Sequence, residues 1–443
     1  MRIIQGGEFD SYWKNNAAYN HDEEVEISVK KIIAAVRTEG DAAVRKFASQ
    51  FDKSSPARLE VPFEQAQRAL EELRSNEPSL AQALELSAQH IKRFSEKQKE
   101  QFSHFEYEME PGLVTGQRII PVERVAVYIP GGRFPLFSSV LMCMIPAFCA
   151  GVEEVILASP PTEDGLPDRK ILAAAAIAAK VADNNNFGIF AIGGAQAIAA
   201  LALGTESVPR VDLIAGPGNK YVAAAKRLLF GETGIDFIAG PTDVLIIADG
   251  QAADGGIEKA ADLAAADMLA QAEHDPDARA RALVPNTEFA EKIAAAVEKR
   301  LKTLPTEKTA RASVDSGGLI IIYKTQEEAI RIANTIAPEH LELQTVDADI
   351  WVHHLKNYGS LFIGSLSAEV LGDYSAGINH TLPTSTSARF TGGLSVRHFL
   401  KTVTTLRCAS GEDFEKTRNA AEILARAEGL EGHAESAVAR ARE

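Results

Sequence analysis

The sequence predicts an α/β protein with two Rossmann-like units, each an incomplete parallel sheet with helices, followed by a small helical tail. At 443 residues the chain exceeds one ordinary hydrophobic core, so about two to four domains are expected. Short apolar runs begin at Val125 and alternate with Ala-rich stretches, and a second set with the same rhythm begins at Ile235. Parallel strands need crossover connections, usually helices, so this alternation is typical of parallel sheets.

The region before the first of these strands, residues 23–105, is expected to be helical. Its apolar residues recur at helical spacing, with charged residues between them. They include Val25, Val29, Ile32, Ile33 and Val36, and later Leu70, Leu73, Leu80, Leu84 and Ile91. We therefore expect amphipathic helices that cover a core.

Both α/β units can be divided into elements. In the first we expect strands at 125–129, 155–158, 187–192 and 211–215, and helices at 138–150, 168–180, 195–203 and 219–230. In the second we expect strands near 244–248, 319–322 and 361–363, and helices near 258–272, 288–301 and 326–336. The tail, helical over 413–428 and beyond, is too small to be stable alone. It must pack on something, such as a second subunit.

Composition and charge narrow the class of function. Hydrophobic residues at 46% and charged residues at 24% are ordinary for a soluble globular protein. The formal net charge of -15, without a dense Lys/Arg run, argues against nucleic acid as a partner. Residues 1–10 hold no signal-peptide core, so the cytoplasm is the expected compartment. The uncharged run 136–152 is short and broken by Pro146, so we expect a buried helix and no membrane partner.

The cysteines give no support for a disulfide framework or a thiolate metal site. Cys143, Cys149 and Cys408 are odd in number and lack CxxC spacing. Any metal site would therefore need nitrogen and oxygen ligands.

The run 372–383 combines turn residues with two ionisable side chains, Asp373 and His380. Its two glycines, asparagine and proline argue against a regular helix, so we expect a fixed loop that offers both side chains to a ligand. A Gly/Asn/Asp turn that happens to contain a histidine is the alternative interpretation.

Glycine follows three of the expected strands, within residues 128–132, 192–196 and 215–219. In an open α/β sheet, ligands bind beyond the carboxyl ends of the strands, where glycine lets the backbone and a helix N-terminus approach phosphate. A nucleotide is therefore expected, although no GxGxxG and no acidic residue at the usual ribose position are present. Simple tight turns are the alternative.

Two further fragments carry candidate chemistry. Gln271 and His274, three residues apart at the end of an expected helix, share a face and could reach one ion, or could simply end a surface helix. Glu339 and His340 are neighbours whose side chains diverge, so they could act on different atoms of one substrate. A solvated pair in a proline-started turn is the alternative.

Together, five segments resemble the histidinol dehydrogenase family, and the likeness extends from about residue 25 to the C-terminus. The segments are IGGAQAIAALALGTESVP, AGPGNKYVAAAKR, DMLAQAEH, APEHLEL and GDYSAGINHTLP. The resemblance implies a zinc-dependent enzyme that oxidises L-histidinol to L-histidine through bound L-histidinal. Two hydrides would pass to NAD, in the last steps of histidine biosynthesis.

The resemblance also implies roles for individual residues of this chain. His340 is implied as the general base, with Glu339 as its catalytic partner. The implied NAD contacts are Tyr128, Gln196 and Asn219, in the glycine-bearing loops already described. The implied zinc ligands are Gln271, His274, Asp373 and His433. The implied substrate contacts are Thr242, Gln271, His274, His340, Asp373, His380, Glu428 and His433.

The resemblance further implies four domains in an intertwined homodimer whose active sites are shared. Residues 25–124 with 240–383 are expected to form the zinc and substrate domain, and 125–239 the NAD domain. Residues 1–24 with 384–407 are expected to form a small linking domain. Residues 408–443 are expected to form a tail domain that crosses to the partner subunit.

This chain departs from the family pattern at two places. Thr242-Asp243 stands where the family commonly has Ser or Thr followed by Glu, and 250–265 looks longer than usual. A family relative that uses the same zinc and NAD on another alcohol, such as sulfopropanediol, is the near alternative; His380 and Glu428 favour histidinol. A non-catalytic nucleotide- or metal-binding module is the distant alternative, but it would have no reason to keep the Glu-His pair.

Overall fold

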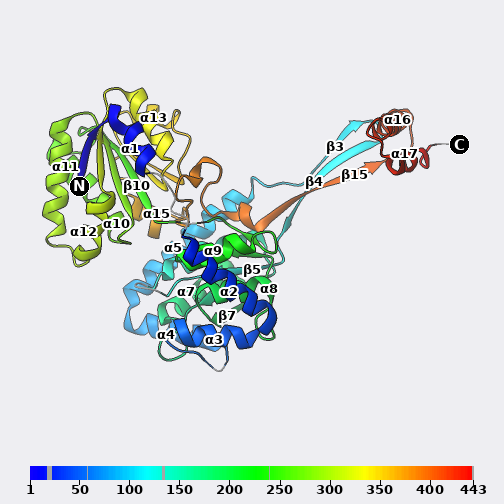
Figure 1. Ribbon diagram of the computed structural model, residues 1–443, viewed down its shortest axis with the longest axis horizontal. Helices are drawn as coiled ribbons and strands as arrows, with labels where there is room; N and C mark the ends of the chain where they lie inside the picture. Colours follow the sequence, from blue (N-terminus) through cyan, green and yellow to red (C-terminus); the bar gives the residue numbers. More distant parts are fainter. Residues whose placement is uncertain (17–21, 57, 132–134, 239, 442–443) are drawn as a thin grey trace.

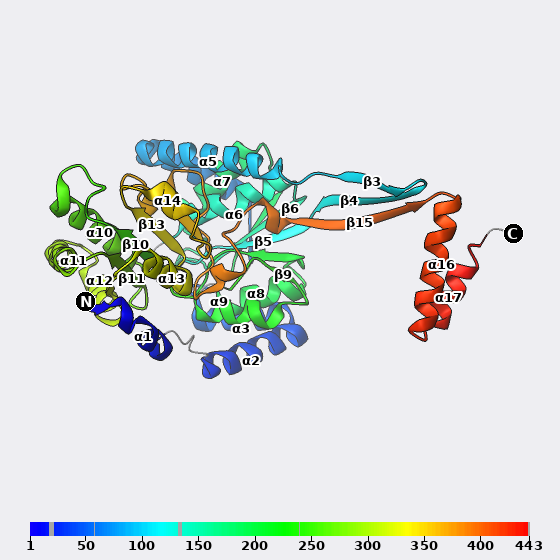
Figure 2. The same cartoon turned by 90° about the horizontal axis from the view of Figure 1, so that it is seen from above.

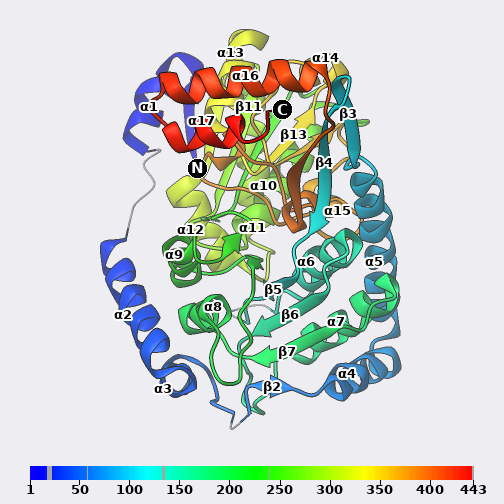
Figure 3. The same cartoon turned by 90° about the vertical axis from the view of Figure 1, so that its right-hand side faces the viewer.

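The chain folds into two α/β lobes from which a long arm projects (Figure 1). The structure is a computed structural model and describes residues 1–16, 22–56, 58–131, 135–238 and 240–441. In Figure 3, which looks along the arm toward the lobes, the two lobes lie one above the other. The predicted α/β class with two parallel-sheet units is confirmed.

The first lobe is built on a parallel sheet with strand order β1-β12-β11-β10-β13-β14. Its strands are β1 (Arg2–Gln5), β10 (Asp243–Ala248), β11 (Arg279–Val284), β12 (Leu319–Ile322), β13 (His340–Gln344) and β14 (Ser360–Ile363). One face packs on α10 (Gly256–Ala272), α11 (Thr287–Leu301) and α12 (Glu307–Gly317). The other packs on α1 (Phe9–Asn16), α13 (Gln326–Ile336) and α14 (Ala348–Val352); η1 (Gly6–Glu8) precedes α1.

The second lobe has strand order β2-β7-β6-β5-β8-β9, parallel except for the antiparallel edge strand β2. Its strands are β2 (Glu60–Val61), β5 (Arg124–Tyr128), β6 (Glu154–Ser159), β7 (Phe187–Ala191), β8 (Leu213–Ala215) and β9 (Gly234–Ile235). One face packs on α4 (Phe63–Asn76), α5 (Pro78–Lys99), α6 (Phe137–Ala150) and α7 (Arg169–Ala182). The other packs on α2 (Glu23–Glu39), α3 (Asp41–Phe51), α8 (Gly194–Leu203) and α9 (Lys220–Leu229).

The expected grouping of residues 25–124 with 240–383 is wrong for the helices α2 to α5. Val25, Val29 and Val36 of α2 are buried in one core with α8 and α9, so these helices complete the second lobe. The expected grouping of 1–24 with 384–407 is also wrong at the N-terminus, because β1 pairs with β12 in the first lobe. An amphipathic helix shows that it has a partner, but not which sheet is the partner.

The arm is an antiparallel sheet of β3 (Phe105–Glu110), β4 (Leu113–Pro121) and β15 (Leu400–Cys408), ending in α16 (Glu412–Ala427) and α17 (Glu431–Val438). Figures 1 and 2 show α16 and α17 at its far end, away from both lobes. No residue of α16 is buried, and Ile423 and Leu424 are 67% and 64% exposed. The tail therefore leaves an apolar face uncovered within this chain. Within the described residues, no helix combines the length and apolarity that a membrane span requires.

Candidate active site

The candidate catalytic residues gather at the amino ends of the strands of the first lobe. His340 is the first residue of β13, and Thr242 directly precedes the neighbouring parallel strand β10. Gln271 lies in the last turn of α10, which follows β10 and returns its C-terminus to the same edge of the sheet. The glycine-bearing loops lie at the opposite type of edge, after β5, β7 and β8 of the second lobe. The expectation that ligand-binding residues lie beyond the carboxyl ends of the strands thus holds only for the second lobe.

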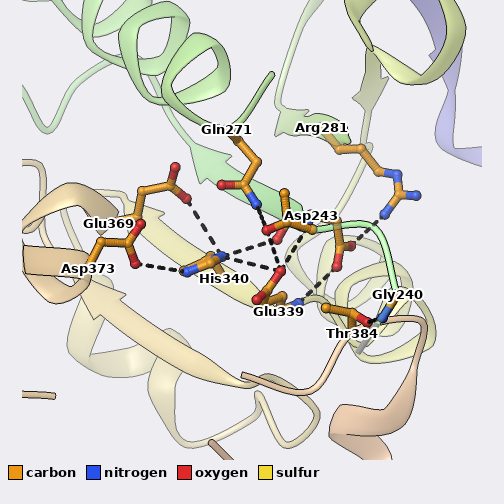
Figure 4. Close-up of polar contacts among 10 residues, drawn as sticks. Gly240, Asp243, Gln271, Arg281, Glu339, His340, Glu369, Asp373 and Thr384 are labelled. Atoms are coloured by element: carbon orange, nitrogen blue, oxygen red, sulfur yellow. Dashed lines mark hydrogen bonds and ion pairs between the residues drawn. The ribbon is translucent and has the colours of Figure 1, made fainter. Parts of the chain in front are cut away.

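His340 is buried among three carboxylates (Figure 4). Its Nδ1 lies 3.9 Å from Oε2 of Glu339 and 3.9 Å from Oε2 of Glu369, while its Nε2 lies 3.3 Å from Oδ1 of Asp373. Burial lowers the pKa of His340, but the carboxylates, Glu339 foremost, outweigh it and raise the pKa well above its usual value. The ring is therefore poised to take and hold a proton.

Glu339 is buried and held at one carboxylate oxygen. Its Oε2 accepts hydrogen bonds from the Thr242 hydroxyl at 2.5 Å and from the Asp243 N–H at 3.1 Å. Burial raises the pKa of Glu339 to about 7, against the opposing charge of His340. A carboxylate with a pKa near neutrality is suited to accept and return protons.

Asp373 lies in a helix and not in a loop, which corrects the expectation for 372–383. The short helix α15 (Glu369–Tyr374) includes Gly372 and Asp373, and the turns begin at Ser375. Gly372 serves close packing: a Cβ there would lie 2.6 Å from a ring carbon of Phe362. Because Gly372 has no Cβ, the Phe362 ring can pack against the helix at this position. The glycine does not end the helix.

His380 joins the two lobes at the site. Its Nδ1 lies 2.7 Å from the Asp373 carbonyl oxygen, and its Nε2 lies 2.8 Å from Oγ of Ser139 on α6. Since a carbonyl only accepts, Nδ1 carries the proton and Nε2 accepts from the Ser139 hydroxyl. Burial lowers the pKa of His380, so the ring is held neutral.

Glu369 belongs to the site although no sequence motif pointed to it. It is buried, Oε2 of its carboxyl has no hydrogen-bond partner among the described residues, and burial raises its pKa well above the usual value. With the Gln271 amide turned so that its nitrogen faces Glu369, that nitrogen donates to Glu369 Oε1 at 3.1 Å. The only signal in the sequence was an acidic residue four positions before Asp373, which is uninformative alone.

The loops of the second lobe meet through close backbone contact. Gly216 has φ +111, and a Cβ there would clash with the Tyr128 carbonyl oxygen, so only glycine brings the β5 and β8 loops together. The Tyr128 hydroxyl accepts from the Gly194 N–H at 3.0 Å. Asn219 caps α9 by accepting from the N–H groups of Tyr221 at 3.0 Å and Val222 at 3.2 Å. These contacts hold the loops after β5, β7 and β8 in fixed positions, where they can form one binding surface.

Asp52, which follows α3, is a second residue that the sequence did not reveal. Its Oδ2 accepts from the side-chain amide of Gln196 at 3.4 Å, and the Gly193 N–H also binds its carboxylate. Burial raises its pKa to about 6, against those two hydrogen bonds. A carboxylate thus lies at the N-terminus of α8, where the backbone N–H groups offset part of the cost of burying its charge. No local pattern around Asp52 signals this, because its partners lie about 140 residues further along.

A cavity of about 970 Å³ opens beside the site, between the lobes. It is lined on one side by the loop and helix after β8, including Gly218, Asn219 and Lys220. Thr242 and Asp243 line it on the other side. The volume suits a ligand of nucleotide size.

Comparison with known proteins identifies the family. The family model for histidinol dehydrogenase matches residues 15–441. Histidinol dehydrogenase from Thermus thermophilus is 46% identical over 416 residues, covering 94% of this chain and 94% of that protein. The corresponding protein from Aquifex aeolicus is 44% identical over 415 residues, covering 93% and 92%. The crystal structure of histidinol dehydrogenase from Elizabethkingia anophelis superposes with a TM-score of 0.87 at 32% identity, covering 97% of this chain and 95% of that one.

The chain belongs to the histidinol dehydrogenase family. It is accordingly an oxidoreductase. A betaine aldehyde dehydrogenase from Staphylococcus aureus shares the fold with a TM-score of 0.52 at 13% identity, covering 87% of this chain and 90% of that one. That likeness concerns the fold alone.

The structure brings together some of the residues that the family resemblance implied, and separates others. Thr242, Gln271, Glu339, His340, Asp373 and His380 share one region, and His274 lies near enough for its charge to affect the pKa of Asp373. Glu428 and His433 lie in the helical hairpin at the end of the arm, away from the other site residues (Figure 1).

The donors at the site fit zinc in type. Gln271, His274 and Asp373 offer oxygen and nitrogen, as a chain without paired cysteines requires. Within the described residues, no three or more His, Cys, Asp or Glu side chains are grouped to hold a metal ion. Since Gln271 lies outside that class of side chain and His433 lies on the arm, one chain alone presents an incomplete set.

Proposed function

We propose that this enzyme oxidises L-histidinol to L-histidine through bound L-histidinal, in the last steps of histidine biosynthesis in the cytoplasm. The observation that carries the proposal is the buried Glu339-His340 pair, with Asp373 beside the imidazole, in a chain of this family. Zinc, when bound by Gln271, His274 and Asp373 of one chain and His433 of a second copy, would supply positive charge that offsets the surrounding carboxylates and would orient the amine and imidazole of the substrate. NAD, when bound on the loops that carry Tyr128, Gln196 and Asn219, supplies the hydride acceptor.

The first oxidation uses His340 as the base. Its ring removes the hydroxyl proton of histidinol as the carbon loses a hydride, which leaves the aldehyde. Asp373, 3.3 Å from Nε2, and the carboxylates near Nδ1 stabilise the imidazolium that forms. The proton then has to leave before His340 can act as the base again.

The second oxidation begins with addition of water to the aldehyde carbon. Glu339 removes one proton from that water as the water oxygen bonds to the carbon, and the aldehyde oxygen takes the proton that His340 acquired in the first oxidation, which gives the hydrate. His340 then takes a hydroxyl proton of the hydrate as a second hydride leaves the carbon, which gives the carboxylic acid. The pKa of Glu339, raised to about 7 by burial, supports this role near neutral pH.

A homodimer with shared sites would complete the pocket. The exposed apolar side chains of the arm helices need a partner, and the helices carry Glu428 and His433. We propose that the arm packs on a second copy of this chain, so that each site receives these two residues from the other subunit.

The decisive experiment is turnover of L-histidinol with NAD, combined with metal analysis. We expect two NADH and one L-histidine for each histidinol, loss of activity with a chelator and recovery with zinc. A fully active metal-free preparation would contradict the ligand set. Inactivity on histidinol together with turnover of sulfopropanediol would assign the chain to the alternative substrate.

A further inference from the structure

Two buried charged side chains without a catalytic role so far lie beside the site, and both line the cavity between the lobes. Arg281 on β11 and Asp243 on β10 occupy neighbouring strands of the first lobe, and both are more than 90% buried. A guanidinium nitrogen of Arg281 donates to Asp243 Oδ2 at 2.9 Å (Figure 4). Arg281 is thus a charged residue inside a central strand, in a position where apolar residues are usual.

Asp243 makes a reciprocal contact with Glu339. Its Oδ1 accepts from the Glu339 N–H at 3.1 Å, while its own N–H donates to Glu339 Oε2 at 3.1 Å. Since β10 and β13 are adjacent parallel strands, this contact fixes the Glu339 backbone and one carboxylate oxygen together. The direction of the Glu339 carboxylate therefore depends on where Asp243 is held.

Arg281 is held in turn by the N-terminal helix. The Trp13 ring of α1 lies 5.4 Å from the guanidinium carbon, and Phe9 stacks on Trp13 with ring centroids 5.4 Å apart. Stacking on an aromatic ring suits the planar guanidinium. A continuous series of contacts thus runs from Trp13 through Arg281 and Asp243 to Glu339.

A buried ion pair is seldom the most stable way to fill a core, because both charges lose their hydration. The presence of this ion pair is explained if the positions of Arg281 and Asp243 serve the reaction. We infer that Arg281 is a positioning residue: it fixes Asp243, and through it aims the Glu339 carboxylate at the water of the second oxidation. This inference rests on the proposed function in one respect, the use of Glu339 as a base.

The test compares the two oxidations in Arg281→Met. Glu339 acts as a base only in the hydration of the aldehyde, whereas in the first hydride loss it contributes only its charge near His340, so we expect the kcat for supplied L-histidinal to fall about tenfold or more. The first hydride transfer, measured in single turnovers of histidinol, should fall less than about threefold, and the KM for histidinal should change little, because Arg281 is linked to Glu339 through Asp243. A role in general stability would lower both oxidations alike.

Two further variants distinguish an effect on the position of Glu339 from an effect on folding. The double variant Arg281→Met, Asp243→Asn leaves no unpaired buried charge, so it should fold and still show the selective loss. Arg300→Met removes an arginine that binds Asp262 at 2.7 and 2.8 Å on the surface of the same lobe, and it should leave both oxidations unchanged.

A crystal structure of the double variant gives a readout without activity. We expect the Glu339 carboxylate to leave the Thr242 hydroxyl and the residue 243 N–H. An unmoved carboxylate, or a folded variant that keeps the wild-type ratio of the two oxidations, overturns the inference. If wild-type protein fails to oxidise histidinol, the proposed function has failed, and the position of Glu339 in that structure still decides the inference.

Discussion

At the scale of single residues, Glu339 and His340 show how adjacent side chains acquire different tasks. Successive residues entering a strand point to opposite faces of the sheet. Glu339 therefore meets Thr242 and Asp243, while the His340 ring meets Asp373 and Glu369. One dipeptide thus supplies two bases with different hydrogen-bond partners, and the two side chains still lie 3.9 Å apart.

His340→Asn should lower the kcat for histidinol at least about a hundredfold, because the amide cannot accept the hydroxyl proton. Zinc content and folding should stay near wild type, since the substitution removes no proposed ligand. Steady-state NADH formation and metal analysis measure the two effects. A near-normal rate would end the role of His340 as base.

Asp52→Asn should alter the pH dependence of stability. The pKa of Asp52 is raised in the folded protein to about 6, above its unfolded value of about 3.9, so its charged form costs stability above pH 6. That cost is relieved as pH falls from about 6 to about 4, where the folded protein takes up the proton. The variant should therefore be more stable at pH 7.5, by about 1 kcal/mol after allowance for its partial exposure, and lose the advantage near pH 4.

Urea denaturation of wild type and Asp52→Asn at pH 4 and pH 7.5 measures this difference. Asp254→Asn, at an exposed position, is the control and should show no such dependence. An equal difference in stability at both pH values would show that burial does not raise the pKa of Asp52 in the folded protein.

At the scale of elements, the buried ion pair of Lys226 and Asp236 acts as a clamp that holds the loop after β8 in place. The Lys226 ammonium on α9 donates to the Asp236 carboxylate and, at 3.1 Å, to the Gly216 carbonyl, while Asp236 Oδ2 accepts the Gly216 N–H at 2.9 Å. Both charged side chains are less than 5% exposed. The clamp thus binds both polar groups of the glycine that joins the β5 and β8 loops.

Lys226→Met should destabilise the protein by about 3–5 kcal/mol, because it leaves Asp236 buried without a counter-charge. The KM for NAD should also rise, since the Gly216 loop leads to Asn219. Lys292→Met is the matched control: it breaks the pair with Glu258, which is 74% exposed at the side chain, and should cost at most about 1 kcal/mol. Equal unfolding midpoints for the two variants would argue against the clamp.

At the scale of the whole molecule, the two lobes present opposite types of strand end to one another. Helix N-termini and glycine loops of the second lobe suit the phosphates of a nucleotide. The amino ends of β10 and β13 offer acid and imidazole groups from the first lobe. His380 and Ser139 join the two, so a change in lobe orientation would be felt at Asp373.

Mixing two inactive variants tests whether sites are shared between subunits. In a mixed dimer of His433→Ala with His340→Asn chains, one of the two sites would contain both wild-type residues. Random exchange makes about half of the dimers mixed, so about a quarter of wild-type activity should return. No recovery after confirmed subunit exchange would place each complete site within one chain.

The sequence by itself determined the features that depend on neighbours along the chain. Alternating apolar runs and Ala-rich stretches predicted the parallel-sheet units, and the expected strand 319–322 coincides with β12. Five segments taken together, among them those around Glu339-His340 and Asp373, indicated the family. A charged strand such as β11, which carries buried Arg281, gave no usable periodicity and was missed.

Only the tertiary structure decided which elements and side chains meet. It placed α2 to α5 on the second sheet, made a helix of the residues around Gly372, and brought Asp52, Glu369 and Arg281 to the ligand sites. Each of these depends on a contact between residues far apart in the sequence, where burial and a specific partner outweigh local preference. Local composition determines what an element can bury, whereas packing selects the partner and thereby the chemistry of each buried charge.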